Sequence, residues 1–196
     1  MTEGYLAKII SIFILLLLST QSFSIEKCNF ELDQKFIKIA FSFYTEDERN
    51  ELKGFFNSPI INGSLFGNSI RKIVQDLKVF LPYNSINTFN TIRDRLIYNS
   101  LINTNNENEN QIQISVVEIE KNNINLNIQI NGITKSVKFK FDSSDISMQA
   151  IGYLDLEDFN LTSVKKIVEN KFQQKIWNDL FIDIQAQFNK KCEKEL

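Results

Sequence analysis

The chain has 196 residues, and its 22 lysines and arginines nearly balance its 24 aspartates and glutamates, which gives a formal net charge of −2. This length is enough for one domain with a substantial core, and the interspersed charges exclude the basic surface typical of a nucleic-acid-binding protein. Histidine is absent, so the chain lacks the commonest general base, the commonest metal ligand and the nucleophile pairs that depend on histidine.

The N-terminus has the pattern of an export signal. Lys8 precedes a nearly uninterrupted apolar run over 9–18, and Ser22-Phe23-Ser24 offers small residues at the positions that a signal peptidase reads. The run is too short to span the roughly 30 Å apolar core of a bilayer. We therefore predict a cleavable signal peptide over 1–24 and an exported domain over 25–196, with a retained membrane anchor as the alternative.

Two cysteines, Cys28 and Cys192, lie at opposite ends of the predicted exported domain. In an oxidising compartment such a pair predicts a disulfide that ties the first strand to the last. The alternative is two unpaired thiols at frayed ends.

Several segments of the first half read as strands with one apolar face. Ile37, Ile39, Phe41 and Phe43 alternate with smaller or polar residues, which is the period of a half-buried strand. Taken in order, the further expected elements are a short strand at 54–56, a helix at 69–77, a strand at 78–86, a helical or irregular connection at 88–101, a solvated turn at 103–110 and a strand at 112–116.

The clearest pattern is a β-hairpin around Asn131-Gly132. Apolar residues alternate with asparagine and glutamine over 124–130, and with serine and lysine over 137–141. Asn-Gly supplies the two positive φ angles of a type I′ turn. A third strand is expected from Ile146, then an amphipathic helix over 161–172, capped by Asp158 or Asn160, and a last strand over 180–188.

These elements amount to seven or eight antiparallel strands and two short helices. Strands with one apolar face must bury that face against another layer. A sandwich and a closed barrel both achieve this, and a barrel also removes the exposed sheet edges. An eight-stranded barrel has an interior just large enough for side chains or for one small ligand.

Four short segments carry a recognisable set of signatures. They are Leu81-Pro82-Tyr83-Asn84-Ser85-Ile86-Asn87-Thr88-Phe89-Asn90 with Arg93-Asp94, then Asn131-Gly132-Ile133-Thr134-Lys135-Ser136-Val137, then Gly152-Tyr153-Leu154-Asp155-Leu156-Glu157-Asp158-Phe159, and finally Lys175-Ile176-Trp177-Asn178-Asp179-Leu180. In this order they resemble motifs of the YceI-like family. The chain departs from that family at Asn87, where aspartate is usual, and at Arg95-Leu96, where a histidine often follows Arg-Asp.

The resemblance implies a mainly β fold, an antiparallel lipocalin-like eight-stranded β-barrel with one or two short helices, exported to the periplasm. It also implies a lumen that holds a polyisoprenoid, an isoprenoid quinone or another long-chain amphiphile, with no cofactor required. The inward side chains expected to line such a lumen are Phe41, Phe43, Phe56, Ile114, Leu126, Ile128, Phe139, Met148, Ile182 and Ile184. The alternative is that the same side chains only pack a filled core.

The polar candidates are fewer. Arg93 and Asp94 are expected either to anchor the connection beside the barrel or to meet a ligand head group at its mouth. Lys165-Lys166 would lie on the amphipathic helix and offers a transient contact with a membrane surface. No metal site is predicted, because the acidic residues after 141 lack the spacing of a calcium loop. A homodimer would be the ordinary twofold arrangement.

Three classes of function follow. The first is a carrier or store for a long-chain lipid, and the second is a non-enzymatic interaction module with a filled barrel. The third, an enzyme, has the least support, because the chain has no nucleophile motif and no phosphate-binding glycine loop. We therefore expect a binding protein rather than an enzyme.

Overall fold

The computed structural model describes residues 26–47, 50–102 and 110–194. The predicted signal peptide and nearly all of the predicted turn at 103–110 lie outside these residues. The described residues divide into two compact units, of which one contains residues 26–28 and 192–194 and the other contains Asn29–Lys191.

The first unit holds the predicted disulfide. Cys28 and Cys192 are bonded across a sequence separation of 164 residues, so the prediction from the cysteine positions is confirmed. Glu26 lies within 4.8 Å of both sulfurs, but a bonded sulfur is not the thiolate that binds a metal.

The second unit is built on one sheet, to which the described residues contribute eleven strands. The strands are β1 (Glu26–Tyr44), β2 (Glu51–Phe56), β3 (Ile60–Asn62), β4 (Phe66–Gly67), β5 (Lys78–Pro82), β6 (Ile86–Asn87), β7 (Gln111–Ile119), β8 (Asn123–Ile130), β9 (Ile133–Ser143), β10 (Ser147–Asp155) and β11 (Asp179–Lys194). The described helices are α2 (Ile70–Gln75), α3 (Thr91–Ile102) and α4 (Thr162–Phe172), and the 3-10 turns are η1 (Tyr83–Ser85) and η2 (Glu157–Phe159).

The sheet curls into a ring. Its hydrogen-bonded order is β3-β5-β7-β8-β9-β10-β11-β1-β2-β6, with β4 beside β1. Strand β5 pairs with β7 and β6 pairs with β2, both antiparallel, and only η1 separates β5 from β6. This one segment therefore links β5, next to one end of the order, with β6 at the other end through the chain itself, and eight segments of the described chain surround a common interior. The predicted antiparallel, lipocalin-like architecture is confirmed, but the described residues hold eleven strands and three helices where seven or eight strands and one or two helices were expected.

The predicted hairpin is confirmed residue by residue. Strands β8 and β9 pair antiparallel up to Ile130 and Ile133, and the turn residues Asn131 and Gly132 have φ angles of 51° and 76°. Along β8 every second side chain is buried, as the alternation predicts.

Two local predictions differ from the structure. The strand expected at 78–86 is bent, because Pro82 ends β5 and the Ser85 hydroxyl donates to the Pro82 carbonyl at 2.7 Å within η1. Neither Asp158 nor Asn160 caps α4. Leu161 holds the N-cap position without a side-chain hydrogen bond, while Asn160 adopts a left-handed φ of 56° that ends η2.

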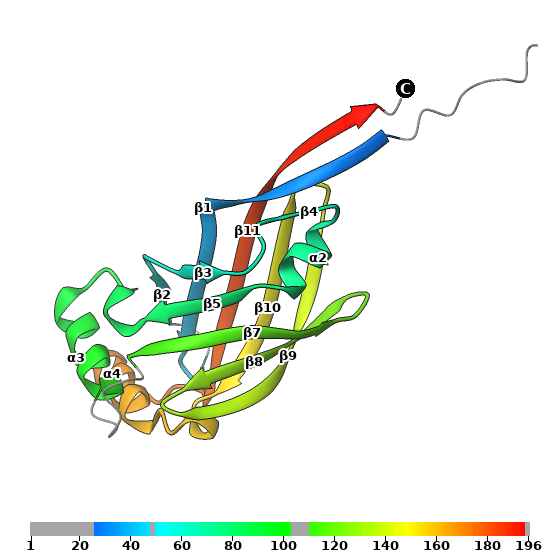
Figure 1. Cartoon of the computed structure of the whole chain (residues 1–196). Coiled ribbons are helices and arrows are strands. Elements are labelled where there is room, and N and C mark those ends of the chain that lie inside the picture. Colours follow the sequence, from blue (N-terminus) through cyan, green and yellow to red (C-terminus); the bar gives the residue numbers. More distant parts are fainter. Residues whose placement is uncertain (1–25, 48–49, 103–109, 195–196) are drawn as a thin grey trace, which may run out of the picture. The chain divides into compact units, whose positions relative to one another are not determined.

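The helices cover the ends of the ring (Figure 1). Helix α2 buries Ile70, Ile73 and Val74 at one end, whereas α3 and α4 pack together at the other. The connection expected to be helical or irregular thus contains α3. None of the helices in the described ranges is long and apolar enough to cross a membrane.

Candidate functional site: an apolar lumen with two cavities

The interior of the ring contains a cavity next to α2, which we call the α2 cavity. It has a volume of about 60 Å³ and a wholly apolar lining. Side chains of β1, β3, β5, β7, β8, β10 and β11 form its wall, and Val74 of α2 and Leu77 close its end.

A second interior cavity lies next to α3 and α4, and we call it the α3–α4 cavity. Its volume is also about 60 Å³ and its lining is also wholly apolar. Strands β1, β2, β6, β7, β8, β10 and β11 form its wall, and its end is closed by Ile97 and Leu101 of α3, Leu161 and Val164. Such walls favour hydrocarbon and offer no directional chemistry.

All ten predicted lumen residues belong to the core around these cavities, nine of them buried and Ile184 half-buried. Those in the wall of the α2 cavity are Ile114, Leu126, Met148 and Ile184. Those in the wall of the α3–α4 cavity are Phe41, Phe43, Phe56 and Ile182. Ile128 and Phe139 are buried but belong to the wall of neither.

Sequence reasoning missed further wall residues. Ala150 and Leu154 lie on β10 at the same alternation as Met148, so the strand pattern already contained them. The helical end caps, such as Val74 and Ile97, carried no comparable signal, because an apolar helix face does not indicate which part of a barrel it will cover.

Helix α2 is fastened over its end of the ring by polar contacts. Arg71 donates to the backbone carbonyls of Glu120 and Lys121 at 2.7 and 2.6 Å, and Gln75 donates to that of Val117 at 3.0 Å. These acceptors belong to β7 and to the turn that follows it, so the helix is tied to the β7–β8 hairpin.

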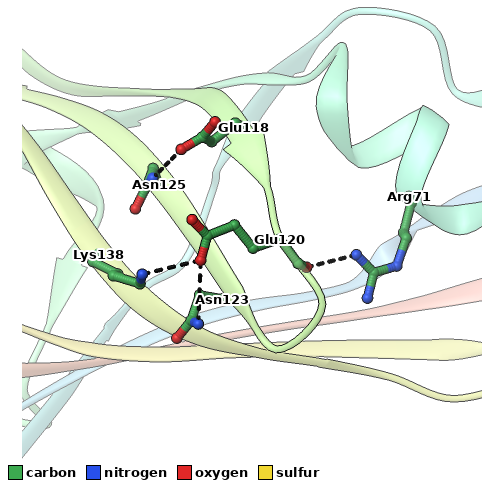
Figure 2. Close-up of polar contacts among 6 residues, drawn as sticks. All are labelled: Arg71, Glu118, Glu120, Asn123, Asn125 and Lys138. Carbon is green, nitrogen blue, oxygen red and sulfur yellow. Dashed lines mark hydrogen bonds and ion pairs between the residues drawn. The ribbon is translucent and has the colours of Figure 1, made fainter.

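The same turn is braced by side-chain contacts, which Figure 2 shows. The Glu120 carboxylate accepts from Lys138 at 3.0 Å and from Asn123 at 3.4 Å, and Glu118 accepts from Asn125 at 2.6 Å. The hydrogen bond and the positive charge of Lys138 lower the pKa of Glu120 below its ordinary value. The turn that receives Arg71 is therefore held by hydrogen bonds of its own.

Arg93 and Asp94 meet on a buried threonine beside α3. The Thr88 hydroxyl donates to Asp94 and accepts from Arg93 Nε at 2.8 Å, while the Thr88 N–H donates to Asp94 at 2.9 Å. Thr88 is only 2% exposed, and a buried hydroxyl is stable when its donor and acceptor capacity are both used. In this structure the pair thus anchors the connection between β6 and α3.

The chain from residue 30 to residue 188 matches the family model of the YceI-like domain. The chain belongs to the YceI-like family. That assignment covers nearly all of the unit Asn29–Lys191, including the ring, both cavities and the Thr88 anchor. The sequence resemblance noted above is thereby confirmed.

Solved structures show the same fold at low sequence identity. A polyisoprenoid-binding domain from Saccharophagus degradans, implicated in plant cell wall breakdown, aligns with a TM-score of 0.57 and 11% identity over 83% of this chain and 98% of its own. BcnA of Burkholderia cenocepacia aligns with a TM-score of 0.53 and 11% identity, over 80% of this chain and 99% of its own. The YceI protein of Campylobacter jejuni aligns with a TM-score of 0.52 and 17% identity, over 74% of this chain and 87% of its own. No curated protein matches this chain.

Proposed function

We propose that this YceI-like protein binds a hydrophobic or amphiphilic long-chain molecule in the lumen of its barrel, as a carrier or store and without catalysing a reaction. A polyisoprenoid or an isoprenoid quinone is the ligand class that we favour. The observation that carries the proposal is the wholly apolar lining of both interior cavities. The polyisoprenoid-binding domain among the structural neighbours supports it.

The energetics suit such a ligand. Burial of each methylene is worth roughly 0.8 kcal/mol, so a chain of several isoprene units gains affinity without any polar contact. Each cavity of about 60 Å³ is smaller than the ~150 Å³ of an engineered cavity that takes up benzene. A long chain must therefore displace side chains of the lumen when it binds. Met148, with its flexible thioether, is suited to such movement.

The disulfide supports an exported protein, because disulfides persist in oxidising compartments. We propose that it resides in the periplasm, which its membership of the YceI-like family also supports. Transient membrane contact through Lys165-Lys166 and a homodimer remain part of the proposal.

A matched pair of substitutions on β10 tests whether a ligand binds inside the barrel. Ala150 is 1% exposed and lies in the wall of the α2 cavity, whereas the side chain of its neighbour Gln149 points outward. Ala150→Leu is expected to fill the cavity and weaken binding of a fluorescent polyprenol at least tenfold. Gln149→Leu adds the same side chain outside and is expected to leave the affinity within twofold of the wild type.

Equal binding by both variants would place the polyprenol on the outer surface and contradict a lumen site. Thermal unfolding of each variant, followed by circular dichroism, provides the folding control. Overpacking a core costs typically 1–3 kcal/mol, so Ala150→Leu is assayed well below its unfolding temperature.

A second candidate is the interaction module with a filled barrel. Small cavities favour it, and so do the exposed apolar side chains of Phe89, Ile92 and Leu96, which are 75%, 74% and 49% exposed. Ile92 and Leu96 share one face of α3, since they are four residues apart. If the protein takes up no polyprenol or quinone, this surface becomes the leading functional candidate.

A further inference from the structure

The two interior cavities are separated by a layer of buried side chains. Along β8, Leu126 lies in the wall of the α2 cavity and Ile130 in that of the α3–α4 cavity. The inward residue between them, Ile128, is 1% exposed and borders neither. The lumen is thus interrupted partway along this strand.

Phe139 is the largest member of this layer. It is completely buried, and it lies on β9, none of whose residues belongs to the wall of either cavity. A completely buried ring that borders neither cavity fills space outside both of them.

Gly152 shows where the Phe139 ring lies. A Cβ atom added to this glycine would be 2.5 Å from Cδ1 and 2.6 Å from Cγ of Phe139, so the ring covers the glycine. On β10, Ala150 lies on one side of Gly152 in the wall of the α2 cavity, and Leu154 lies on the other side in the wall of the α3–α4 cavity. The ring therefore lies against β10 at a depth between the two cavities.

We propose that Phe139 determines the length of apolar chain that the barrel accepts, by dividing the lumen into two short compartments. This inference rests on the proposed binding of an apolar chain in the lumen. A ligand short enough to stay on one side of the ring displaces other side chains of that compartment and leaves the ring in place. A longer ligand must turn the ring aside, and part of its binding energy is lost in doing so.

The test compares geraniol with geranylgeraniol, which share a head group and differ by two isoprene units. Binding of each is measured by calorimetry on the wild type, on Phe139→Ala and on Phe139→Leu, which retains more of the core should the alanine variant not fold. Phe159→Ala is the matched control, because Phe159 is a 1% exposed phenylalanine that borders neither cavity.

The expected result is a gain of at least tenfold in affinity for geranylgeraniol in Phe139→Ala, a smaller gain in Phe139→Leu, and a change under threefold for geraniol in both. Phe159→Ala should match the wild type for both prenols. If the Phe139 variants keep the wild-type ratio between the two prenols, the role of Phe139 is overturned while lumen binding stands. If folded protein of every variant binds neither prenol, the proposed function itself fails and this inference fails with it.

Discussion

Replacing Gly152 with alanine is expected to lower the free energy of unfolding by about 2–3 kcal/mol. The added methyl group would lie 2.5 Å from the ring of Phe139, which is closer than two non-bonded carbon atoms approach in folded proteins. Since Phe139 is completely buried, its ring has no solvent into which to move, and overpacked cores lose typically 1–3 kcal/mol. Urea denaturation measures the loss.

A double-mutant cycle with Phe139→Leu identifies the cause. If the ring alone makes Gly152 necessary, Gly152→Ala should cost less than about 1 kcal/mol when the ring is absent, which is the non-additivity expected of residues in contact. A full penalty in the Phe139→Leu background would show that the glycine serves another purpose. That result would contradict the placement of the ring against Gly152.

Removal of the disulfide is the second large effect that we expect. Cys28→Ser with Cys192→Ser releases a loop with a sequence separation of 164 residues. The chain-entropy model gives up to about 5 kcal/mol for such a loop, and measured losses are typically about 2–4 kcal/mol. Urea denaturation of the wild type with and without reductant, beside the double serine variant, measures the loss.

The double serine variant is its own control, because reductant should shift the midpoint of the wild type and leave that of the variant unchanged. Coincident midpoints for all samples would mean that the bond restrains little of the unfolded chain. Fraying of β1 and β11 near the cysteines would be the physical reason for such a result.

The strands were predictable because their signals are local. Asn131-Gly132 specifies both the type of the turn and the register of β8 and β9, and the structure has this turn and this register. Closure of the ring was harder to predict from the sequence. It depends on the bend between β5 and β6 and on the pairing of β6 with β2, which lies about thirty residues earlier. In that pairing Phe56 lies opposite Ile86. Such distant pairing leaves no pattern within a short window.

The inward set of side chains was also predictable, but their separate roles were not. Ile128 and Phe139 follow the same alternation as Leu126, yet they separate the cavities instead of bordering one. The alternation gives the face of a strand and not the depth along the barrel. A usable signal was Gly152, since a glycine inside a strand often marks a close approach of another group.

The signature residues Arg93 and Asp94 show how a motif can be recognised before its role is clear. Both hold Thr88 at the start of the α3 segment, so their geometry accounts for a structural role without any ligand. The Arg-Asp motif alone could not separate this role from contact with a head group. The sequence does not show that Thr88 is buried or that both side chains bind it.

Native mass spectrometry of the full chain, expressed with its own N-terminus and purified from the periplasmic fraction, tests the central claim most directly. We expect a protein ion heavier than the apoprotein, and a long-chain isoprenoid or similar amphiphile in the solvent extract of the same sample. A bare protein mass, together with no uptake of added isoprenoid quinones or polyprenols, would contradict lipid binding by this chain and favour the interaction module.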